Sequence, residues 1–276
     1  MIQHLLHYVP SNLSNYYEPF LGGGALFFAI CSRRDNLHAY LSDLNSELIN
    51  AYKIIKERPD ELIETLFRFQ NEYYDSEDKS RYYYDKRDWR PSRPVDSAGR
   101  FLFLNKTCYN GLYRVNSRGD FNVPYGRYKH PKIIDEENIR AVSDALRDTN
   151  ASLLVQDYRK AVAECGRNDF VYFDPPYQPR SKTSSFTDYT PNGFSGKDHT
   201  ELAQEVQLLV ERECTVLLSN SETAFTSRLY RQFEISKVTV NRPINSVGSG
   251  RRGYRELIVF DGPETTESLS EIIREK

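Results

Sequence analysis

Four consecutive residues, Asp174-Pro175-Pro176-Tyr177, combine a carboxylate, a rigid backbone and an aromatic ring. They follow an apolar run, residues 170–173, that predicts a short buried strand. Because proline has no N–H to donate to a sheet, the strand must end here, at the edge where open α/β sheets bind ligands. The Asp174 carboxylate and the Pro175 carbonyl are two acceptors, and the Tyr177 ring offers a flat face. This combination suits a planar heteroaromatic guest with an amino group; the alternative is a strand-ending turn with a surface tyrosine.

A glycine-rich turn follows the first predicted strand, residues 15–20, and precedes an apolar helix over 25–32. Strand, glycine turn and helix form an arrangement in which the backbone can approach a ligand closely. Glu18 stands just before this turn, where a carboxylate can meet a cationic cofactor. A second strand, 39–43, ends at Asp43, about twenty residues after the glycines. At this separation in sequence, dinucleotide-binding folds carry the acid that binds the ribose hydroxyls. The alternative role for Asp43 is a helix N-cap.

The rest of the chain alternates predicted helices with predicted strands. Helical spacing covers residues 47–56, 60–74, 97–106, 138–148 and 197–212, and strand patterns cover 151–155, 215–219, 233–240 and 255–260. Asp157 and Asp174 each follow a strand, so that with Glu18 and Asp43 four predicted strand ends carry acids. The pattern predicts an α/β fold, an open mixed sheet with helices on both faces, interrupted by a mostly helical insert.

The insert is basic and aromatic. Residues 79–132 contain 13 Lys and Arg against 4 Asp and no Glu, a net charge of +9, whereas the whole chain carries −2 and the remainder therefore −11. Such a segment in an otherwise acidic chain indicates a polyanion that is bound and stacked upon. The alternative is a solvated charged surface. Within the insert, residues 112–123 predict two short strands around a turn at Gly119, a β-hairpin.

The composition disfavours several other classes of protein. No apolar run approaches the ~20 residues of a membrane helix, and we expect no signal peptide, so the expected location is cytoplasmic. The 4 cysteines lack C-x-x-C spacing and indicate neither disulfides nor zinc. None of them lies in a Pro-Cys loop, although methylation of cytosine at carbon 5 requires a thiolate. The 5 histidines form no ligand cluster, and we expect no metal site.

Five stretches of the chain resemble the DNA adenine methyltransferases of the Dam type, which methylate GATC. These stretches are residues 17–24, 42–45, 109–128, 174–177 and 219–220. The stretch 109–128 is the most specific, because it resembles the recognition hairpin of that family nearly residue for residue. The resemblance runs from about residue 2 to residue 260. It implies S-adenosylmethionine as methyl donor and the N6 amino group of adenine in duplex DNA as acceptor.

The resemblance also assigns roles to individual residues. It implies cofactor binding by Glu18, Phe20, Gly22, Gly24, Asp43, Asp157, Tyr158 and Asp174. It implies DNA binding by Tyr109, Asn110, Leu112, Arg114, Pro124, Tyr128 and Lys129. Catalysis falls to Asp174, Pro175, Pro176 and Tyr177: two acceptors bind the adenine amine, and the ring stacks on a base that has left the duplex. Relatives that act on cytosine N4 or on a glutamine side chain usually carry Ser or Asn at the position of Asp174, which disfavours them.

We expect a catalytic methyltransferase domain formed by residues 1–56 and 150–262, a DNA target-recognition insert over 57–149, and a peripheral tail over 263–276. One family motif is absent, a sequence resembling Phe-x-x-Trp-Ala-Gly-Gly-Lys that would stand just before residue 3. It helps to bind the methionine end of the cofactor and directs a lysine towards DNA. The alternative function is therefore a methyltransferase-like DNA-binding protein with weak or no turnover. We expect a monomer, and the sequence leaves open whether a partner restriction endonuclease exists.

Overall fold

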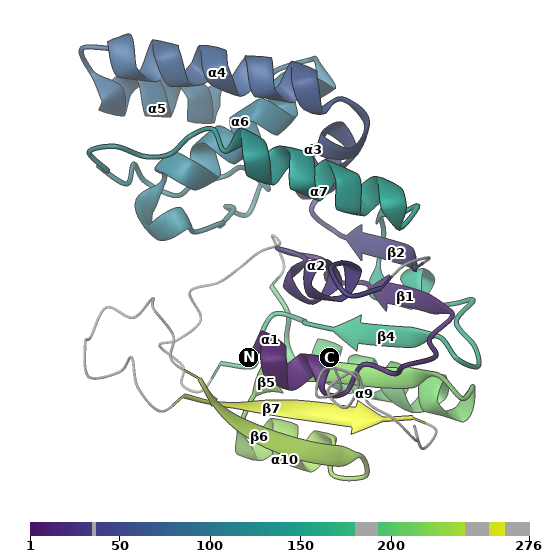
Figure 1. The fold of residues 1–276 in the computed structure, drawn as a ribbon. Coiled ribbons are helices and arrows are strands. Elements are labelled where there is room, and N and C mark those ends of the chain that lie inside the picture. The colour runs from purple at the N-terminus through teal and green to yellow at the C-terminus, as the bar shows by residue number, and fades with distance from the viewer. Residues whose placement is uncertain (35–36, 180–192, 241–253, 263–276) are drawn as a thin grey trace. The chain divides into compact units, whose positions relative to one another are not determined.

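The computed structural model describes residues 1–34, 37–179, 193–240 and 254–262 (Figure 1). Their contacts form two compact units. The first comprises residues 1–43, 149–179, 194–240 and 254–262 of the described chain, and the second comprises residues 44–148 and 193. Residues 180–192 and 241–253 and the predicted tail over 263–276 lie outside the described residues.

The first unit is built on a seven-stranded sheet with the order β3-β2-β1-β4-β5-β7-β6. The strands are β1 (Asn15–Glu18), β2 (His38–Asp43), β3 (Ser152–Val155), β4 (Phe170–Phe173), β5 (Thr215–Ser221), β6 (Glu234–Val240) and β7 (Tyr254–Asp261). Neighbours from β3 to β5 pair in parallel, and β7 runs antiparallel to both β5 and β6 (Figure 1). This is the mixed sheet that the alternating sequence pattern predicts.

Helices cover both faces of this sheet, as predicted. They are α1 (Ile2–Leu6), α2 (Ala25–Cys31), α8 (Tyr158–Ala161), α9 (Gly196–Glu211) and α10 (Ala224–Leu229). Val171 and Phe173 of β4 lie in one core cluster with the apolar face of α9. On the other face, Tyr16 of β1 stacks on Phe27 of α2. Because both faces are covered, all four residues of β4 are buried, which explains its continuous apolar sequence.

The second unit is mostly helical. Its elements are α3 (Ser46–Glu57), α4 (Pro59–Asp75), α5 (Lys79–Asp88), α6 (Pro94–Thr107), a 3-10 turn (Tyr109–Gly111) and α7 (Glu136–Asp148). Arg100 of α6 is buried and pairs with Glu47 of α3 at 2.8 Å, so α3 packs within this unit, which begins at Leu44 rather than near residue 57. Across the described parts of both units, no helix is long and apolar enough to span a membrane.

The predicted hairpin forms in the second unit, with isolated antiparallel bridges in place of two continuous strands. The bridges pair Cys108 with Tyr125 and Val115 with Phe121. Gly119 has a φ of 84° at the turn, the left-handed conformation predicted for it. Pro124 cannot donate to a ladder, which contributes to the interruption. The Tyr83 hydroxyl donates to the carbonyl of Val123 at 2.8 Å and attaches the hairpin to α5.

Candidate active site

Asp174 follows the carboxyl end of β4 and is held by the neighbouring strand β5. The Ser219 hydroxyl donates to Oδ1 of Asp174 at 2.8 Å, and the Tyr172 hydroxyl lies 2.9 Å from Oγ of Ser219. Tyr172 and Ser219 are buried, whereas Asp174 is exposed. An accessible carboxylate that buried groups fix in place is well arranged to accept hydrogen bonds from a ligand.

The ring and the exit of the same loop are anchored as well. The Tyr177 hydroxyl donates to Oε2 of Glu256, a buried residue of β7, at 3.1 Å. Burial, and then the charges of Asp174 and Glu256, raise the pKa of Tyr177 well above its usual range, so Tyr177 remains a neutral donor. Beyond the ring, the N–H of Gln178 donates to Oδ1 of Asn220 at 3.0 Å. The loop is therefore anchored by hydrogen bonds at Asp174, Tyr177 and Gln178.

Glu18, the last residue of β1, is a carboxylate with only 2% of its surface exposed. The Tyr16 hydroxyl donates to its Oε2 at 2.8 Å. Burial raises the pKa of Glu18 well above its usual range; the Tyr16 hydrogen bond opposes this rise, and the charges of Asp174 and Asp43 add to it. The backbone N–H of Phe27 donates to the carboxylate and also opposes the rise. A cationic ligand group would therefore supply the charge that this carboxylate needs in order to ionise.

Asp43 ends β2 and is bound to the glycine turn. Its Oδ2 accepts the N–H of Gly22 at 3.1 Å. The alternative interpretation of Asp43 as a helix N-cap is wrong, because Asn45 caps α3 by accepting the N–H groups of Glu47 and Leu48. The Asp43 carboxylate thus belongs to the turn that follows β1, as a ligand-binding role requires.

The glycine turn borders open space. A Cβ placed at Gly22 or Gly23 would meet no atom within 4 Å. At Gly24 it would come within 3.0 Å of the Phe28 ring, and this glycine also has a left-handed φ of 61°. Gly22 has a φ of 45°, which likewise favours glycine. The turn can therefore present its backbone to a ligand on the side of Gly22 and Gly23.

Asp157 and Tyr158 follow β3 and engage protein partners in the structure. Oδ1 of Asp157 accepts both the backbone N–H and the Nε–H of Arg159, at 3.0 and 2.8 Å, and caps α8. The Tyr158 ring is buried between Phe20 and Phe173, with ring centroids 5.4 and 6.3 Å away. Tyr158 thereby supports the Phe20 ring from the core. The roles of Asp157 and Tyr158 at a cofactor stay predictions.

Four residues that bind the loop after β4 received no role from the sequence. Ser219 and Asn220 lie at the end of β5 as Asp174 lies at the end of β4, so the strand-end rule could have identified them. Tyr172 stands inside an apolar run with no signal to distinguish it. Glu256 comes from β7, whose amino end meets the carboxyl ends of the parallel strands, and a rule for parallel strands does not find it.

The predicted DNA-binding residues lie in and around the hairpin of the second unit. Tyr109, Asn110, Pro124, Tyr128 and Lys129 are exposed, and Leu112 and Arg114 are half-buried. The Tyr109 side chain is 53% exposed, although its N–H donates to the carbonyl of Pro124 at 2.8 Å. Asn110 has a φ of 55°, uncommon for a residue other than glycine. A rigid turn therefore presents an aromatic ring and an amide to solvent.

Arg114 is oriented by its partner across the hairpin. Its Nε–H donates to Oδ1 of Asn122 at 2.7 Å, and Nη2 donates to the Asn122 carbonyl at 3.3 Å. Arginine has five N–H donors in a planar fork, and these two contacts use one side of it. The terminal edge formed by Nη1 and Nη2 keeps donors for a second bidentate partner.

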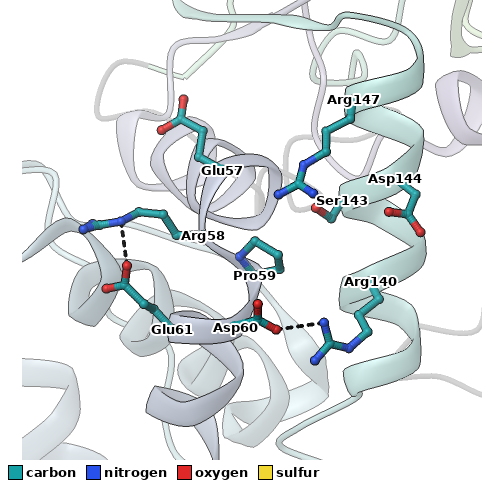
Figure 2. A pocket seen from close by; sticks show the side chains of 9 residues that line it. All are labelled: Glu57, Arg58, Pro59, Asp60, Glu61, Arg140, Ser143, Asp144 and Arg147. Atoms are coloured by element: carbon teal, nitrogen blue, oxygen red, sulfur yellow. Dashed lines mark hydrogen bonds and ion pairs between the residues drawn. The ribbon is translucent and has the colours of Figure 1, made fainter.

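A pocket of about 540 Å³ in the second unit contains none of the predicted site residues (Figure 2). Its lining includes two short ion pairs, Arg58 with Glu61 at 2.9 Å and Arg140 with Asp60 at 2.8 Å. The lining as a whole has four acids and three arginines, so its net charge of −1 is too small to select an ion strongly. Among the residues that the structure describes, no three His, Cys, Asp or Glu side chains are arranged to bind a metal.

The described chain thus combines a mixed sheet, a carboxylate loop after the central strand β4 and a mostly helical unit that contains the basic segment. Residues 1–244 match the family of D12 class N6 adenine-specific DNA methyltransferases, and the chain belongs to this family. The family predicted from the sequence is confirmed, and the chain is an adenine-specific DNA methyltransferase.

Individual relatives agree with this family. The chain is 42% identical over 259 residues to the Type II methyltransferase M.MjaIII of Methanocaldococcus jannaschii, covering 91% of this chain and 89% of the relative. It is 40% identical over 265 residues to the Type II methyltransferase M1.LlaDCHI of Lactococcus lactis subsp. cremoris, covering 94% and 90%. It is 36% identical over 260 residues to the DNA adenine methylase of Escherichia coli K12, covering 89% and 86%.

Proposed function

We propose that this chain transfers a methyl group from S-adenosylmethionine to the N6 amino group of an adenine that has been flipped out of duplex DNA, within GATC. The observation that carries the proposal is the loop after β4. There the exposed Asp174 carboxylate accepts a hydrogen bond of 2.8 Å from Ser219. The Tyr177 hydroxyl donates a hydrogen bond of 3.1 Å to Glu256, which fixes the ring.

The loop can make the adenine amine a better nucleophile. An adenine amine is a poor nucleophile because its lone pair is delocalised into the ring. The Asp174 carboxylate and the Pro175 carbonyl can accept its two N–H groups, which favours a lone pair directed out of the ring plane. The carboxylate also stabilises the positive charge that develops on N6 during transfer. Alignment is the other contribution of the chain.

The residues around the glycine turn fit the proposed methyl donor. Glu18 is a buried carboxylate suited to the ammonium of an amino acid, Asp43 is suited to ribose hydroxyls, and the backbone at Gly22 and Gly23 faces open space. S-adenosylmethionine, when bound, supplies an electrophilic methyl group. Phe20, Gly24, Asp157 and Tyr158 complete the proposed cofactor site.

Flipping and sequence choice are assigned to the second unit. Removing a base from the stack costs a few kcal/mol, and the exposed Tyr109 and Asn110 are suited to fill the gap that it leaves. The terminal edge of Arg114 matches O6 and N7 of guanine in the major groove. Leu112 and Pro124 offer apolar surface to a thymine methyl group. We include Tyr128 and Lys129, which are exposed, among the proposed DNA contacts.

The test is methyl transfer from labelled S-adenosylmethionine to a duplex that contains one GATC, followed by digestion to nucleosides. The label should appear in N6-methyladenine, and a duplex already methylated on both strands should accept none. Asp174→Ala should abolish single-turnover transfer while duplex binding stays within about twofold, because the carboxylate acts on the flipped amine. Label in cytosine, or an active Asp174→Ala variant, would contradict the proposal.

A further inference from the structure

We infer that Ser219 is a positioning residue for methyl transfer, which acts through Asp174 by fixing the orientation of the carboxylate that receives the adenine amine. The inference rests on the proposed function of Asp174. It concerns a fully buried residue of β5, and it adds a buried hydrogen-bond chain to the loop after β4.

The direction of that chain follows from proton counting. The single hydroxyl proton of Ser219 is donated to Oδ1 of Asp174 at 2.8 Å, because an ionised carboxylate can only accept. Ser219 Oγ must then be the acceptor in its 2.9 Å contact with Tyr172. Burial, and then the charge of Asp174, raise the pKa of Tyr172 well above its usual range, which keeps its hydroxyl protonated as the donor. The order is therefore Tyr172 to Ser219 to Asp174.

Both donors of the chain are fixed by the sheet itself. Tyr172 is 4% exposed and Ser219 is 0% exposed, and they stand on the paired parallel strands β4 and β5. Hydrogen bonds in such surroundings strengthen one another and resist rotation. The carboxylate of an exposed aspartate otherwise turns easily about its Cβ–Cγ bond. Ser219 thus supplies preorganisation that Asp174 lacks on its own, and preorganised acceptors cost no rearrangement during transfer.

The same anchoring recurs along the loop, which supports a positioning role for this edge of the sheet. Asn220, the next residue of β5, binds the N–H of Gln178 at 3.0 Å. Glu256, paired in register with Ser221, binds the Tyr177 hydroxyl. Ser219 also has a hydrogen bond with Tyr177, but it differs from these two because it binds the carboxylate that is proposed to accept the adenine amine. Its removal should therefore affect the chemical step and its pH dependence.

The experiment compares Ser219→Ala, Ser219→Thr and Ser221→Ala with the native chain in single-turnover transfer to a GATC duplex at saturating cofactor. Ser219→Ala should slow transfer about 10- to 100-fold, the effect of one hydrogen bond to a charged group. Its dissociation constants for duplex and cofactor should stay within about twofold. Ser219→Thr keeps the hydroxyl and should recover most of the rate. Ser221→Ala, two residues further along β5, should leave the rate unchanged.

A pH series separates positioning from mere packing. Ser219→Ala removes a donor to the ionised form of Asp174, so the acidic limb of its transfer rate should move to higher pH, while Ser219→Thr should keep the native limb. Tyr172→Phe should slow transfer less than Ser219→Ala, and the double variant Tyr172→Phe/Ser219→Ala should be no slower than Ser219→Ala alone. Thermal unfolding of each variant establishes that it is folded.

Parallel measurement of Asp174→Ala keeps the two ideas distinct. If Asp174→Ala is inactive while Ser219→Ala transfers at the native rate, the inference is overturned and the proposed function stands. If Asp174→Ala remains active, the proposed catalytic role itself fails. An unshifted acidic limb in Ser219→Ala, or rate losses of Tyr172→Phe and Ser219→Ala that multiply, would show that Ser219 does not act through Asp174 in this chain of donors.

Discussion

At the scale of a single residue, Glu18 illustrates how a proposed cofactor-binding residue can lower the stability of the fold. Its carboxyl is buried and its pKa in the folded chain lies well above the ordinary value of 4.5. The unfolded chain therefore releases this proton at lower pH than the folded chain does. A group whose folded pKa is raised contributes stability below its unfolded pKa, and this contribution is lost as the pH rises through the folded pKa. At neutral pH the burial of Glu18 therefore lowers the free energy of unfolding.

The variant Glu18→Gln tests this balance. It retains an acceptor for the Tyr16 hydroxyl and cannot ionise, so it should unfold at a higher temperature than the native chain at neutral pH. The gain should be about 2–4 °C for each kcal/mol, and it should vanish below the ordinary carboxyl pKa of about 4.5. Thermal unfolding over a series of pH values measures it. A difference that is the same at every pH would show that Glu18 does not titrate as described.

The same variant, Glu18→Gln, should gain stability but lose affinity for the cofactor. Since the ionised carboxylate is the form that attracts an ammonium group, the affinity of the native chain for S-adenosylmethionine should increase with pH. Glu18→Gln should bind more weakly and lose this pH dependence. Calorimetric titrations in buffers of different ionisation enthalpy would also reveal the proton that Glu18 releases on binding. Equal affinities for the two proteins would remove Glu18 from the proposed cofactor site.

At the scale of elements, the hairpin fixes the orientation of the Arg114 guanidinium group. Asn122 binds the Nε side of Arg114, so the hairpin sets which edge of the fork is presented. Arg114→Ala should cost about 1–3 kcal/mol on GATC and relax the preference at one guanine only. Asn122→Ala should relax the same position to a smaller extent, because the arginine remains but is no longer oriented.

Methylation rates on GATC and on duplexes altered at each guanine measure this selectivity. Arg118 provides the matched control, since its side chain is 82% exposed in the hairpin turn and lies 3.4 Å from Asp120. Arg118→Ala should leave the ranking of the duplexes unchanged. If Arg114→Ala lowers the rate on every duplex by one common factor, Arg114 contacts phosphate and does not read a base.

The elements that the sequence predicted are those with a clear apolar period. The longer helices have such a period, and central strands such as β4 have a continuous apolar run instead, whereas α5 is rich in charged and aromatic residues and buries only Tyr83. Helices α8 and α10 have 4 and 6 residues, too few for a period to show. Asp174, Glu18 and Asp43 were predictable from strand ends. Glu256 was not, because its position depends on pairing between β5 and β7, which no local pattern encodes.

At the scale of the whole molecule, the positive charge is concentrated in one segment of the chain. Residues 79–132 carry a net +9 and the rest of the chain −11. Some of these cations serve the fold: Lys86 pairs with Glu72 at 3.1 Å and lies 3.9 Å from the centre of the Phe69 ring. Others, such as Lys129, are exposed. Only the second kind can exchange bound counterions for DNA phosphates.

Lys129→Ala should therefore weaken duplex binding to the same extent on GATC and on unrelated sequences. Each phosphate contact contributes about −0.9 to the slope of log affinity against log salt concentration, so the variant should have a slope shallower by about 1. Lys86→Met is the control, because a thioether can replace the half-buried cation against the aromatic rings. It should alter thermal stability and leave the slope unchanged. Fluorescence anisotropy with labelled duplexes at several salt concentrations measures both, and an unchanged slope for Lys129→Ala would exclude Lys129 from the phosphate contacts.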